Sequence, residues 1–595
     1  MTSISLFSPR RLFLSLGAAF LILASTAGPA AAAPAWVERS DANTQVLLEV
    51  MARLSPEGAG RLGIPGLDES ILDLRPGFVE RTREAWKKAG ETLRPRLAAE
   101  KDPAVRQDLQ ILLDAVDSNL RGLELGEKYQ LPYFNLTEAV FGGLESLLDD
   151  RIEASRRPAA LVRLRKYAGL EPGFAPLARL AEAEIRTRLG VQGLLGPVKE
   201  EVERDLANNQ TVRAGIGELF RTHGIKGYEQ PLAELEKQLV AYDDFVRREI
   251  LPRARTDFRQ PAELYAFSLK EYGVDMPVDE LVSRAEVAFR EIQNEMQALA
   301  PLVAKQHGLT VTDYRQVLGE LKKKQLEGEA ILPLYQERVR QLEEIIRREK
   351  IVTVPERPMR VRLASEAESV GSPAPHMRPP RLIGNQGEMG EFVLPLSIPG
   401  QQGGVALKLD DFSYEALSWA LTAHEGRPGH ELQYSSLIEN GVSKARAIFA
   451  FNSVNAEGWA LYAEAEVKPF LPIDGQLAAL QSRLLRAARA FLDPGLQAGT
   501  ITREEAMRIL REEVVQSEGM ALQEVQRYTF RSPGQATSYF LGYLRLMELR
   551  AETERILGPR FDRLAFHDFI LAQGLLPPAL LRQAVYDDFI PRRKK

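Results

Sequence analysis

The chain has 595 residues, of which 45% are hydrophobic and 27% are charged, and it contains no cysteine. This composition is typical of a globular protein and excludes a fibrous or broadly disordered one. The formal net charge is −5, so we predict that nucleic acid is not a partner, because no excess of positive charge is present to bind a polyanion. Without cysteine, neither disulfides nor a lipid on an N-terminal cysteine are expected, and any metal must be held by nitrogen and oxygen.

Residues 1–33 have the pattern of a cleaved secretory signal peptide. Arg10-Arg11 precede an apolar run from Leu12 to Ala24, and Pro29 and a tract of alanines follow it. The run is shorter than the roughly 20 residues that cross a bilayer, so we expect cleavage and no stable membrane anchor. The segment also resembles a twin-arginine signal, although Pro9 stands where serine or threonine is usual. A periplasmic or secreted protein is therefore expected.

Most of the chain that follows has apolar residues at helical spacing with charged residues between them. The clearest examples are 105–120, 160–170, 198–206, 231–247, 277–299 and 331–350. Runs of charge within these segments are typical of solvated helix faces rather than of binding patches. The pattern predicts a large, mainly α-helical protein.

The pattern changes after residue 350. β-Branched residues from Ile351 begin a proline-rich segment with two short strand patterns, Met359 to Leu363 and Glu391 to Leu396. We interpret Glu391–Pro395 as an edge strand to which an extended peptide adds. Helical spacing returns at about Tyr414. We predict one unit with an N-terminal helical lobe at 34–350, a catalytic lobe at 351–595, and a small sheet beside the cleft between the lobes.

The most informative motif is His424-Glu425-Gly426-Arg427-Pro428-Gly429-His430. A catalytic zinc ion typically takes three protein ligands and leaves one position for water, while a carboxylate that is not a ligand accepts the proton of that water. On a regular helix the two histidines would lie roughly 120° apart and could not face one ion. If both are ligands, Pro428 and Gly429 must break or bulge the helix.

Other carboxylates compete for places in this site. Glu431 would share a helical face with His424 on an unbroken helix, but Pro428 argues against such a helix, so His430 is the preferred ligand. Glu457 and Glu464 share a face of a later apolar helix. We interpret Glu457 as the third ligand and Glu464 as an acceptor that orients a ligand histidine. The alternative is an exposed acidic stripe.

Three motifs occur in order along the chain: His424-Glu425-x-x-Pro428-Gly429-His430-x-Leu432-Gln433, Glu457-Gly458-Trp459-Ala460-x-Tyr462, and Arg527-Tyr528 followed by Pro533-Gly534-Gln535-Ala536-x-x-Tyr539-x-x-Gly542. Together they resemble the bacterial DUF885 family. The resemblance implies a zinc metallopeptidase similar to the helical gluzincin-type peptidases, with a large two-lobed fold. It further implies one Zn²⁺ held by His424, His430 and Glu457, with Glu425 as general base. The chain departs from the pattern at Glu431, where a second adjacent histidine is often found.

Peptide hydrolysis builds negative charge on the carbonyl oxygen, so a hydrogen-bond donor should face the metal. Tyr539 and Tyr528 are the candidates, and core packing is the alternative for each. Gln535 is a candidate for holding the substrate backbone, and Arg527 or Arg545 for pairing with a peptide carboxylate. The remaining histidines stand alone in the sequence and are expected to pack or to lie at the surface.

The sequence thus predicts an exported zinc-dependent hydrolase whose partner is a peptide substrate. Two alternatives stay open. One is a non-catalytic periplasmic peptide-binding or scaffold protein on the same fold, against which Glu425 argues because metal binding alone does not need that carboxylate. The other is a zinc hydrolase that acts on a non-peptide amide or on an ester.

Overall fold

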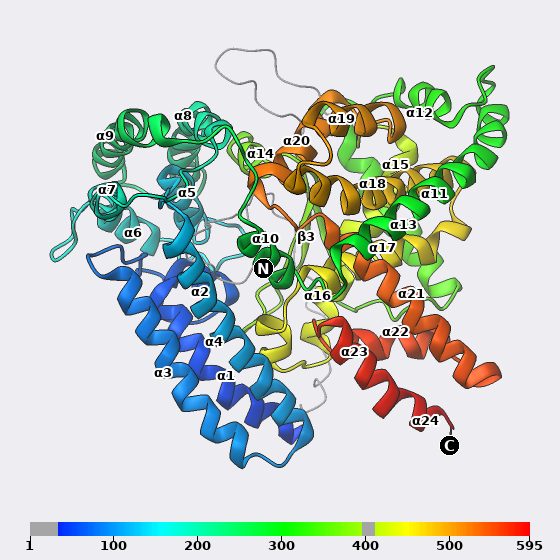
Figure 1. Ribbon diagram of the computed structural model, residues 1–595, viewed down its shortest axis with the longest axis horizontal. Helices are drawn as coiled ribbons and strands as arrows, with labels where there is room; N and C mark the ends of the chain where they lie inside the picture. Colours follow the sequence, from blue (N-terminus) through cyan, green and yellow to red (C-terminus); the bar gives the residue numbers. More distant parts are fainter. Residues whose placement is uncertain (1–33, 396–410, 595) are drawn as a thin grey trace.

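The computed structural model describes residues 34–395 and 411–594 (Figure 1). The predicted signal peptide at 1–33 and Leu396 of the second predicted strand lie outside the described residues. Within them, the protein is mainly helical with a single small sheet, which confirms the predicted fold class. A search of these helices for a stretch long and apolar enough to cross a membrane finds none.

The N-terminal helices lie mostly on the left of Figure 1. They are α1 (Ala35–Leu54), α2 (Pro56–Leu62), α3 (Phe78–Ala99), α4 (Pro103–Tyr129), α5 (Leu136–Glu145), α6 (Ala159–Tyr167), α7 (Leu177–Arg188), α8 (Lys199–Thr222) and α9 (Glu229–Phe245). The long helices α1, α3 and α4 pack around Trp86 and Leu112. Asp102 caps α4 by accepting from the Ala104 amide, and Pro103 occupies its first turn, so this helix begins where the sequence favours a start.

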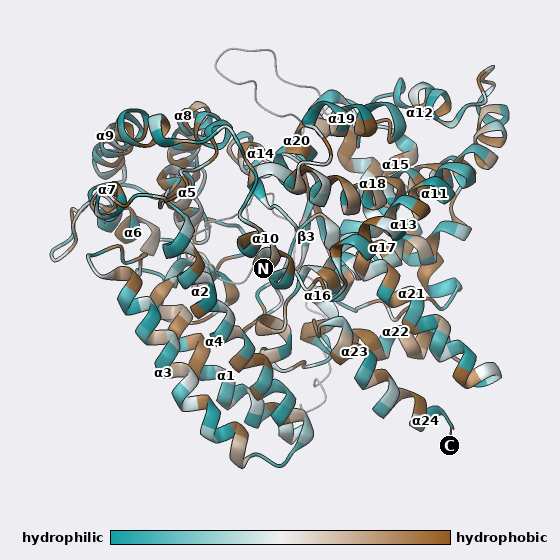
Figure 2. Cartoon of the chain, in the orientation of Figure 1, coloured by the Kyte–Doolittle hydropathy of each residue, from teal (hydrophilic) through white to brown (hydrophobic). Residues whose placement is uncertain are grey.

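The central and C-terminal helices lie mostly on the right of Figure 1. They are α10 (Ala262–Glu271), α11 (Val278–His307), α12 (Tyr314–Lys322), α13 (Ile331–Arg348), α14 (Glu366–Gly371), α15 (Glu415–Glu425), α16 (His430–Glu439), α17 (Ser453–Val467), α18 (Ile473–Ala498), α19 (Arg503–Arg508), α20 (Glu518–Gln526), α21 (Thr537–Leu557), α22 (Arg563–Ala572), α23 (Pro578–Ala584) and α24 (Ile590–Lys594). Most helices carry both hydrophobic and hydrophilic stripes in Figure 2, as expected of amphipathic helices.

One apolar core joins helices from both sides of residue 350. Leu281, Phe289 and Met296 on α11 pack with Leu484 and Phe491 on α18. The division into lobes at residue 350 stays a prediction; in the packing, α11 belongs with the C-terminal helices that carry the histidine motif.

The sheet has three strands in the order β1-β3-β2, namely β1 (Arg360–Leu363), β3 (Glu391–Leu394) and β2 (His376–Arg378). β1 runs parallel to β3, and β2 runs antiparallel with Met377 opposite Phe392. The two predicted strands are confirmed, but the prediction that 391–395 is an edge strand is wrong. β3 is central and buried along its whole length, as its consecutive apolar residues allow. The edge nearest the histidine motif belongs to β2.

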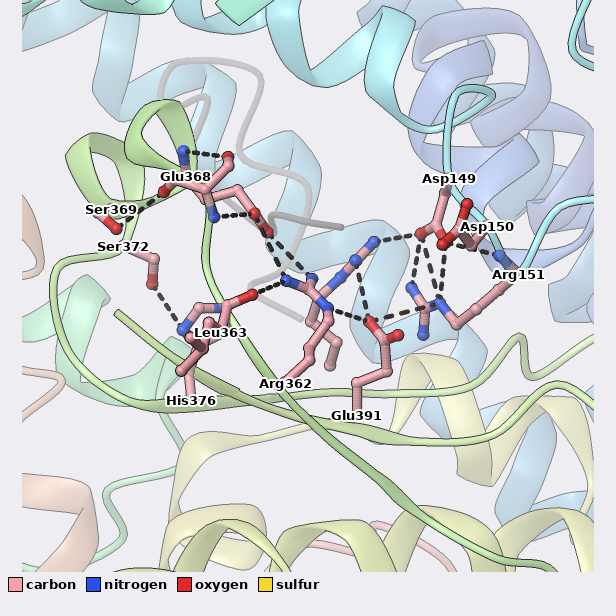
Figure 3. Close-up of polar contacts among 12 residues, drawn as sticks. Asp149, Asp150, Arg151, Arg362, Leu363, Glu368, Ser369, Ser372, His376 and Glu391 are labelled. Carbon is pink, nitrogen blue, oxygen red and sulfur yellow. Dashed lines mark hydrogen bonds and ion pairs between the residues drawn. The ribbon is translucent and has the colours of Figure 1, made fainter. Parts of the chain in front are cut away.

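Buried charges tie this sheet to the N-terminal helices (Figure 3). Arg378 on β2 donates to Asp149, which follows α5, at 2.7 Å and to Glu391 on β3 at 3.2 Å. Arg362 on β1 donates to the same Glu391 at 3.1 Å and to Glu368 on α14 at 3.0 Å. Because each carboxylate has an arginine partner, the charges offset one another's cost of burial. The network holds β2 between the two groups of helices.

Candidate metal centre

The histidine motif spans a break between two helices, as predicted. α15 ends at Glu425 and α16 begins at His430, with Gly429 as its N-cap. A Cβ atom on Gly429 would lie 2.0 Å from the carbonyl oxygen of His424, so only glycine fits this close approach. The break allows histidines that a regular helix would separate to face one another, and their ring centroids are 4.8 Å apart.

His424, His430 and Glu457 each direct one donor atom to a common point. Glu457 Oε2 lies 3.2 Å from His430 Nε2 and 3.5 Å from His424 Nε2, and the three donors all lie within 4.8 Å of one another. Tetrahedral zinc with bonds of 2.0–2.2 Å places its ligands about 3.4 Å apart. Both distances to Glu457 therefore match those between zinc ligands, and three protein donors would leave a fourth position for water.

Glu464 lies directly behind His424. Its Oε1 is 2.7 Å from His424 Nδ1, and both side chains are almost fully buried. A carboxylate in this place holds the proton of Nδ1 and thereby orients the ring so that Nε2 faces Glu457. Burial opposes protonation of His424, but the hydrogen bonds to Glu457 and Glu464 outweigh it and raise its pKa to about 9. Glu464 thus lies where a carboxylate that orients the His424 ring was predicted.

Glu431 points elsewhere. It is fully buried, accepts a hydrogen bond from Arg427 Nε at 2.6 Å, and accepts another from Ser435 at 2.6 Å. Arg427 also donates to Glu343 and to the Arg357 carbonyl, so the pair belongs to a network away from the three donors. Of the two competing ligands, the structure brings His430 to the centre.

Glu457 is placed by a close contact between α17 and α21. A Cβ on Gly458 would lie 2.4 Å from the Gly542 Cα, and one on Gly542 would lie 2.0 Å from the Val454 carbonyl oxygen. The helices can therefore meet only where both residues are glycine. Gly458 belongs to the second of the three motifs and Gly542 to the third. Their contact fixes Glu457 relative to Tyr539.

Tyr539 lies against the centre. Its ring stacks on that of His424 at a centroid distance of 6.1 Å, with Arg489 4.4 Å above it. Its hydroxyl accepts from Arg527 Nη1 at 3.1 Å. Burial and the Glu457 carboxylate raise the pKa of Tyr539, so that its hydroxyl stays protonated and able to donate.

Tyr528, the other candidate, is fully buried and donates its hydroxyl to Glu524 at 2.8 Å. This contact matches the core-packing alternative. Arg545 likewise lies apart from the centre and pairs with Asp275 at 2.9 Å and Glu548 at 3.2 Å. Neither residue is among those that line the cavity at the metal centre.

Gln535 and Arg527 do lie at the centre. Gln535 Nε2 is 3.4 Å from Glu457 Oε1, and Gln535 Oε1 accepts from Arg527 Nη1 at 3.2 Å. With Glu457 and Tyr539 they line a cavity of about 1610 Å³ whose other walls include Met51 of α1 and Leu580 of α23. Its wall thus combines residues from near both ends of the chain.

Glu425 is positioned by the sheet. Its Oε2 accepts a hydrogen bond from the Met377 amide of β2 at 2.8 Å. A backbone donor leaves no signal in the sequence, so this contact was not predictable. Arg489 was also missed, although an arginine within the apolar face of a predicted helix is a recognisable sign of a buried partner, here Glu524.

His567 shows the packing role predicted for the isolated histidines. Its Nε2 accepts from the Tyr462 hydroxyl at 2.7 Å, and its Nδ1 donates to the Ile351 carbonyl at 2.7 Å. Burial lowers its pKa to about 3, which keeps the ring neutral.

Comparisons with known proteins agree with the fold. A family described as "Bacterial protein of unknown function (DUF885)" matches residues 56–585. Two solved structures resemble the chain, one from Shewanella oneidensis described as a candidate lipoprotein of unknown function and one from Colwellia psychrerythraea described as a candidate lipoprotein. The first has a TM-score of 0.68 and 19% identity, covering 93% of this chain and 100% of its own. The second has 0.71 and 18%, covering 93% and 99%. No curated protein matches the sequence.

Proposed function

This chain belongs to the DUF885 family of bacterial proteins of unknown function, and from the residues of its candidate metal centre we propose that it is a zinc-dependent hydrolase that cleaves peptide bonds. The observation that carries the proposal is the meeting of His424, His430 and Glu457 at one point, with a further carboxylate, Glu425, next to a ligand in sequence and held by a backbone amide. A site that only stored metal would not need Glu425.

The chain's own residues supply the remaining functions of such a site. His424, His430 and Glu457 would hold the zinc ion, which when bound acts as a Lewis acid towards water and a carbonyl group. Glu425 takes a proton from the attacking water and passes it to the leaving amine. Its hydrogen bond from Met377 fixes the carboxylate without neutralising it.

Tyr539 is the better placed of the two tyrosines for the developing oxyanion. Its hydroxyl is near the centre and remains a donor, while Tyr528 already donates to Glu524. The edge strand β2 lies beside the general base, because its Met377 amide donates to Glu425, and we place an extended peptide along this edge. The substrate backbone would then run past the general base.

Export belongs to the same proposal. The signal pattern at 1–33 and the description of two structural neighbours as candidate lipoproteins both favour a protein that acts outside the cytoplasm. Peptides in the periplasm or in the medium would be its substrates.

The proposal is tested by Glu425→Gln, which keeps the shape of the side chain and removes the base. We expect one zinc ion per chain in both proteins, and a loss of hydrolysis of about 10²- to 10⁴-fold in the variant. Glu415→Gln is the control, since Glu415 lies at the other end of α15 and pairs with Arg338. Measurements use a peptide library with mass-spectrometric detection, with and without a chelator.

Three results would contradict the proposal in whole or in part. Full hydrolysis by zinc-loaded Glu425→Gln would show that Glu425 is not the general base. Absence of metal and of hydrolysis in protein purified without an affinity tag would favour a peptide-binding protein, and hydrolysis of esters or other amides alone would keep the chemistry but change the substrate.

A further inference from the structure

Arg527 is a cation at the metal centre whose hydrogen bonds go to neutral groups. It begins the short π-helical turn Arg527–Arg531 and lines the cavity at the metal centre with its side chain about 25% exposed. Its Nη1 donates to Gln535 Oε1 at 3.2 Å and to the Tyr539 hydroxyl at 3.1 Å. A guanidinium has five donors in a planar fork that matches a carboxylate, so these two bonds leave much of its capacity unused.

The acids around Arg527 are engaged by other groups. Glu524 lies 3.9 Å from Arg527 Nη2, but it forms two short bonds with Arg489, at 2.6 and 2.8 Å, and accepts the Tyr528 hydroxyl. Asp493 accepts the Gly534 amide at 2.9 Å and the Tyr265 hydroxyl at 2.9 Å. The positive charge of Arg527 therefore lacks a dedicated carboxylate partner among the described residues.

Arg527 is also connected to the proposed metal ligands through a single intervening side chain on each of two paths. Gln535 connects it to the ligand Glu457, and Tyr539 connects it to the ring of His424. An extended peptide advances about 3.3–3.6 Å per residue. A carboxylate on Arg527 would thus belong to the residue next to the scissile bond or to the one after it.

We propose that Arg527 binds a carboxylate of the substrate, and that the site is that of a carboxypeptidase, which releases one or two residues from the C-terminus of a peptide. This inference rests on the proposed zinc peptidase function. The same chemistry can come from the side chain of aspartate or glutamate beside the scissile bond, and the experiment separates the two sources.

The reaction balances without a further reactant. One water molecule is consumed, its hydroxyl joins the acyl carbon as the C–N bond breaks, and its proton passes through Glu425 to the leaving amine. The released amino acid or dipeptide keeps the carboxylate that Arg527 held, and the remaining peptide gains a new C-terminal carboxylate.

The test compares three forms of one peptide: with a free C-terminal carboxylate, with a C-terminal amide, and with a C-terminal amide and an internal glutamate. Rates of hydrolysis are measured for the zinc-loaded wild type and for Arg527→Gln and Arg527→Lys. Arg483→Gln is the matched control, because Arg483 of α18 likewise donates to the hydroxyl of a tyrosine on α21, Tyr543, at 3.0 Å but does not line the cavity at the metal centre.

We expect the wild type to cleave the free acid about 10- to 100-fold faster than the amide, as judged from the strength of charge-assisted hydrogen bonds. The ratio should fall to near one in Arg527→Gln, recover in part in Arg527→Lys, and stay unchanged in Arg483→Gln. Mass spectra should show products shortened from the C-terminus by one or two residues.

Equal cleavage of acid and amide by the wild type, or internal cuts as the main products, would overturn the inference while leaving the peptidase proposal intact. Preference for the internal glutamate in an amidated peptide would assign Arg527 to an acidic side chain instead. Absence of hydrolysis of all three peptides would count against the peptidase proposal. Calorimetry with the acid and the amide then still decides whether Arg527 binds a carboxylate, and equal affinities would refute it.

Discussion

We expect Glu464 to act on the proposed metal centre through another side chain. It touches His424 Nδ1 and none of the other donors. Replacing Glu464 with glutamine removes the charge that holds the ring, and losses of about 10- to 100-fold in metal affinity are typical of such changes. We expect a decrease of that size in zinc affinity, measured by competition with a chromogenic chelator.

Glu466→Gln is the control for this prediction. Glu466 lies on the same helix and is also buried, but it pairs with Arg550 and Arg563 rather than with a histidine. Its zinc affinity should match that of the wild type. A common loss in both variants would show that the effect comes from the helix and not from the contact with His424.

We expect His424 to make zinc binding and stability depend on pH in opposite directions. In the metal-free protein its pKa is raised to about 9 by the two glutamates, so a proton must leave before the metal binds. Zinc affinity should therefore rise about tenfold per pH unit and level off above pH about 9. Calorimetry in buffers of different ionisation enthalpy should detect about one proton released per zinc ion.

The same shift predicts the stability of the metal-free protein. The folded-state pKa of His424 lies above its unfolded value of 6.5, so its contribution is complete below pH 6.5 and is lost as the pH rises to 9. The loss is about 3 kcal/mol at 1.36 kcal/mol per unit. Urea unfolding of chelator-treated protein at several pH values checks this; stability that rises between pH 7 and 9 would contradict it.

At the scale of helices, the contact between α17 and α21 sets the distance between the third ligand and Tyr539. Gly458→Ala places a methyl group 2.4 Å from the Gly542 Cα, and the two backbones must separate. We expect a loss of about 1–3 kcal/mol in the free energy of unfolding, together with weaker zinc binding. Thermal or urea unfolding and the chelator assay measure both effects.

Gly319→Ala gives the matched control within a helix. A Cβ at Gly319 on α12 meets nothing within 4 Å. Alanine is the better helix former by roughly 1 kcal/mol, so this variant should be as stable as the wild type or more stable. If Gly458→Ala behaved like Gly319→Ala, the helices would not depend on the glycine contact.

The helices were predictable because their apolar spacing is local. The patterns at 277–299 and 331–350 correspond to α11 and α13. β2 was not predicted, since three residues give too short an alternation to recognise. The central place of β3 was also not predictable, because strand order is set by pairing with segments far along the chain.

The candidate site divides in a similar way. Pro428 and Gly429 predicted the helix break, and the spacing of Glu457 and Glu464 predicted that they share one helical face. The choice between Tyr528 and Tyr539 could not be made from the sequence, because it depends on the π-helical turn at 527–531, which directs the Tyr528 hydroxyl to Glu524, and on the place of Tyr539 on α21. Nor could sequence alone reveal that Arg427 engages Glu431 and leaves His430 at the centre.

For the whole molecule, the position of the proposed metal centre predicts a limit on the substrate. The side chains of His424, His430 and Glu457 are only 2%, 11% and 18% exposed, and Glu457 lines a cavity whose wall both groups of helices form. We expect a peptide chain to reach the centre through this cavity. We expect cleavage of short or unfolded peptides and no cleavage of folded proteins.

This prediction is checked with one peptide sequence, tested both as a free peptide and as part of a folded protein. A peptide excised from a stable protein should be cut, and the same segment within the folded protein should remain intact during the same incubation, as followed by mass spectrometry. Rapid cleavage of the folded protein would mean that the cavity opens far wider than the structure shows.

The cavity wall draws on residues from Met51 to Leu580. During synthesis the three proposed metal ligands are complete once residue 457 has emerged, yet Tyr539 and the last part of the wall are still to be made. We therefore expect a nascent chain to be unable to hydrolyse peptides until its final helices pack against the rest. The order of synthesis would by itself delay the proposed activity, with no need for a separate inhibitory segment.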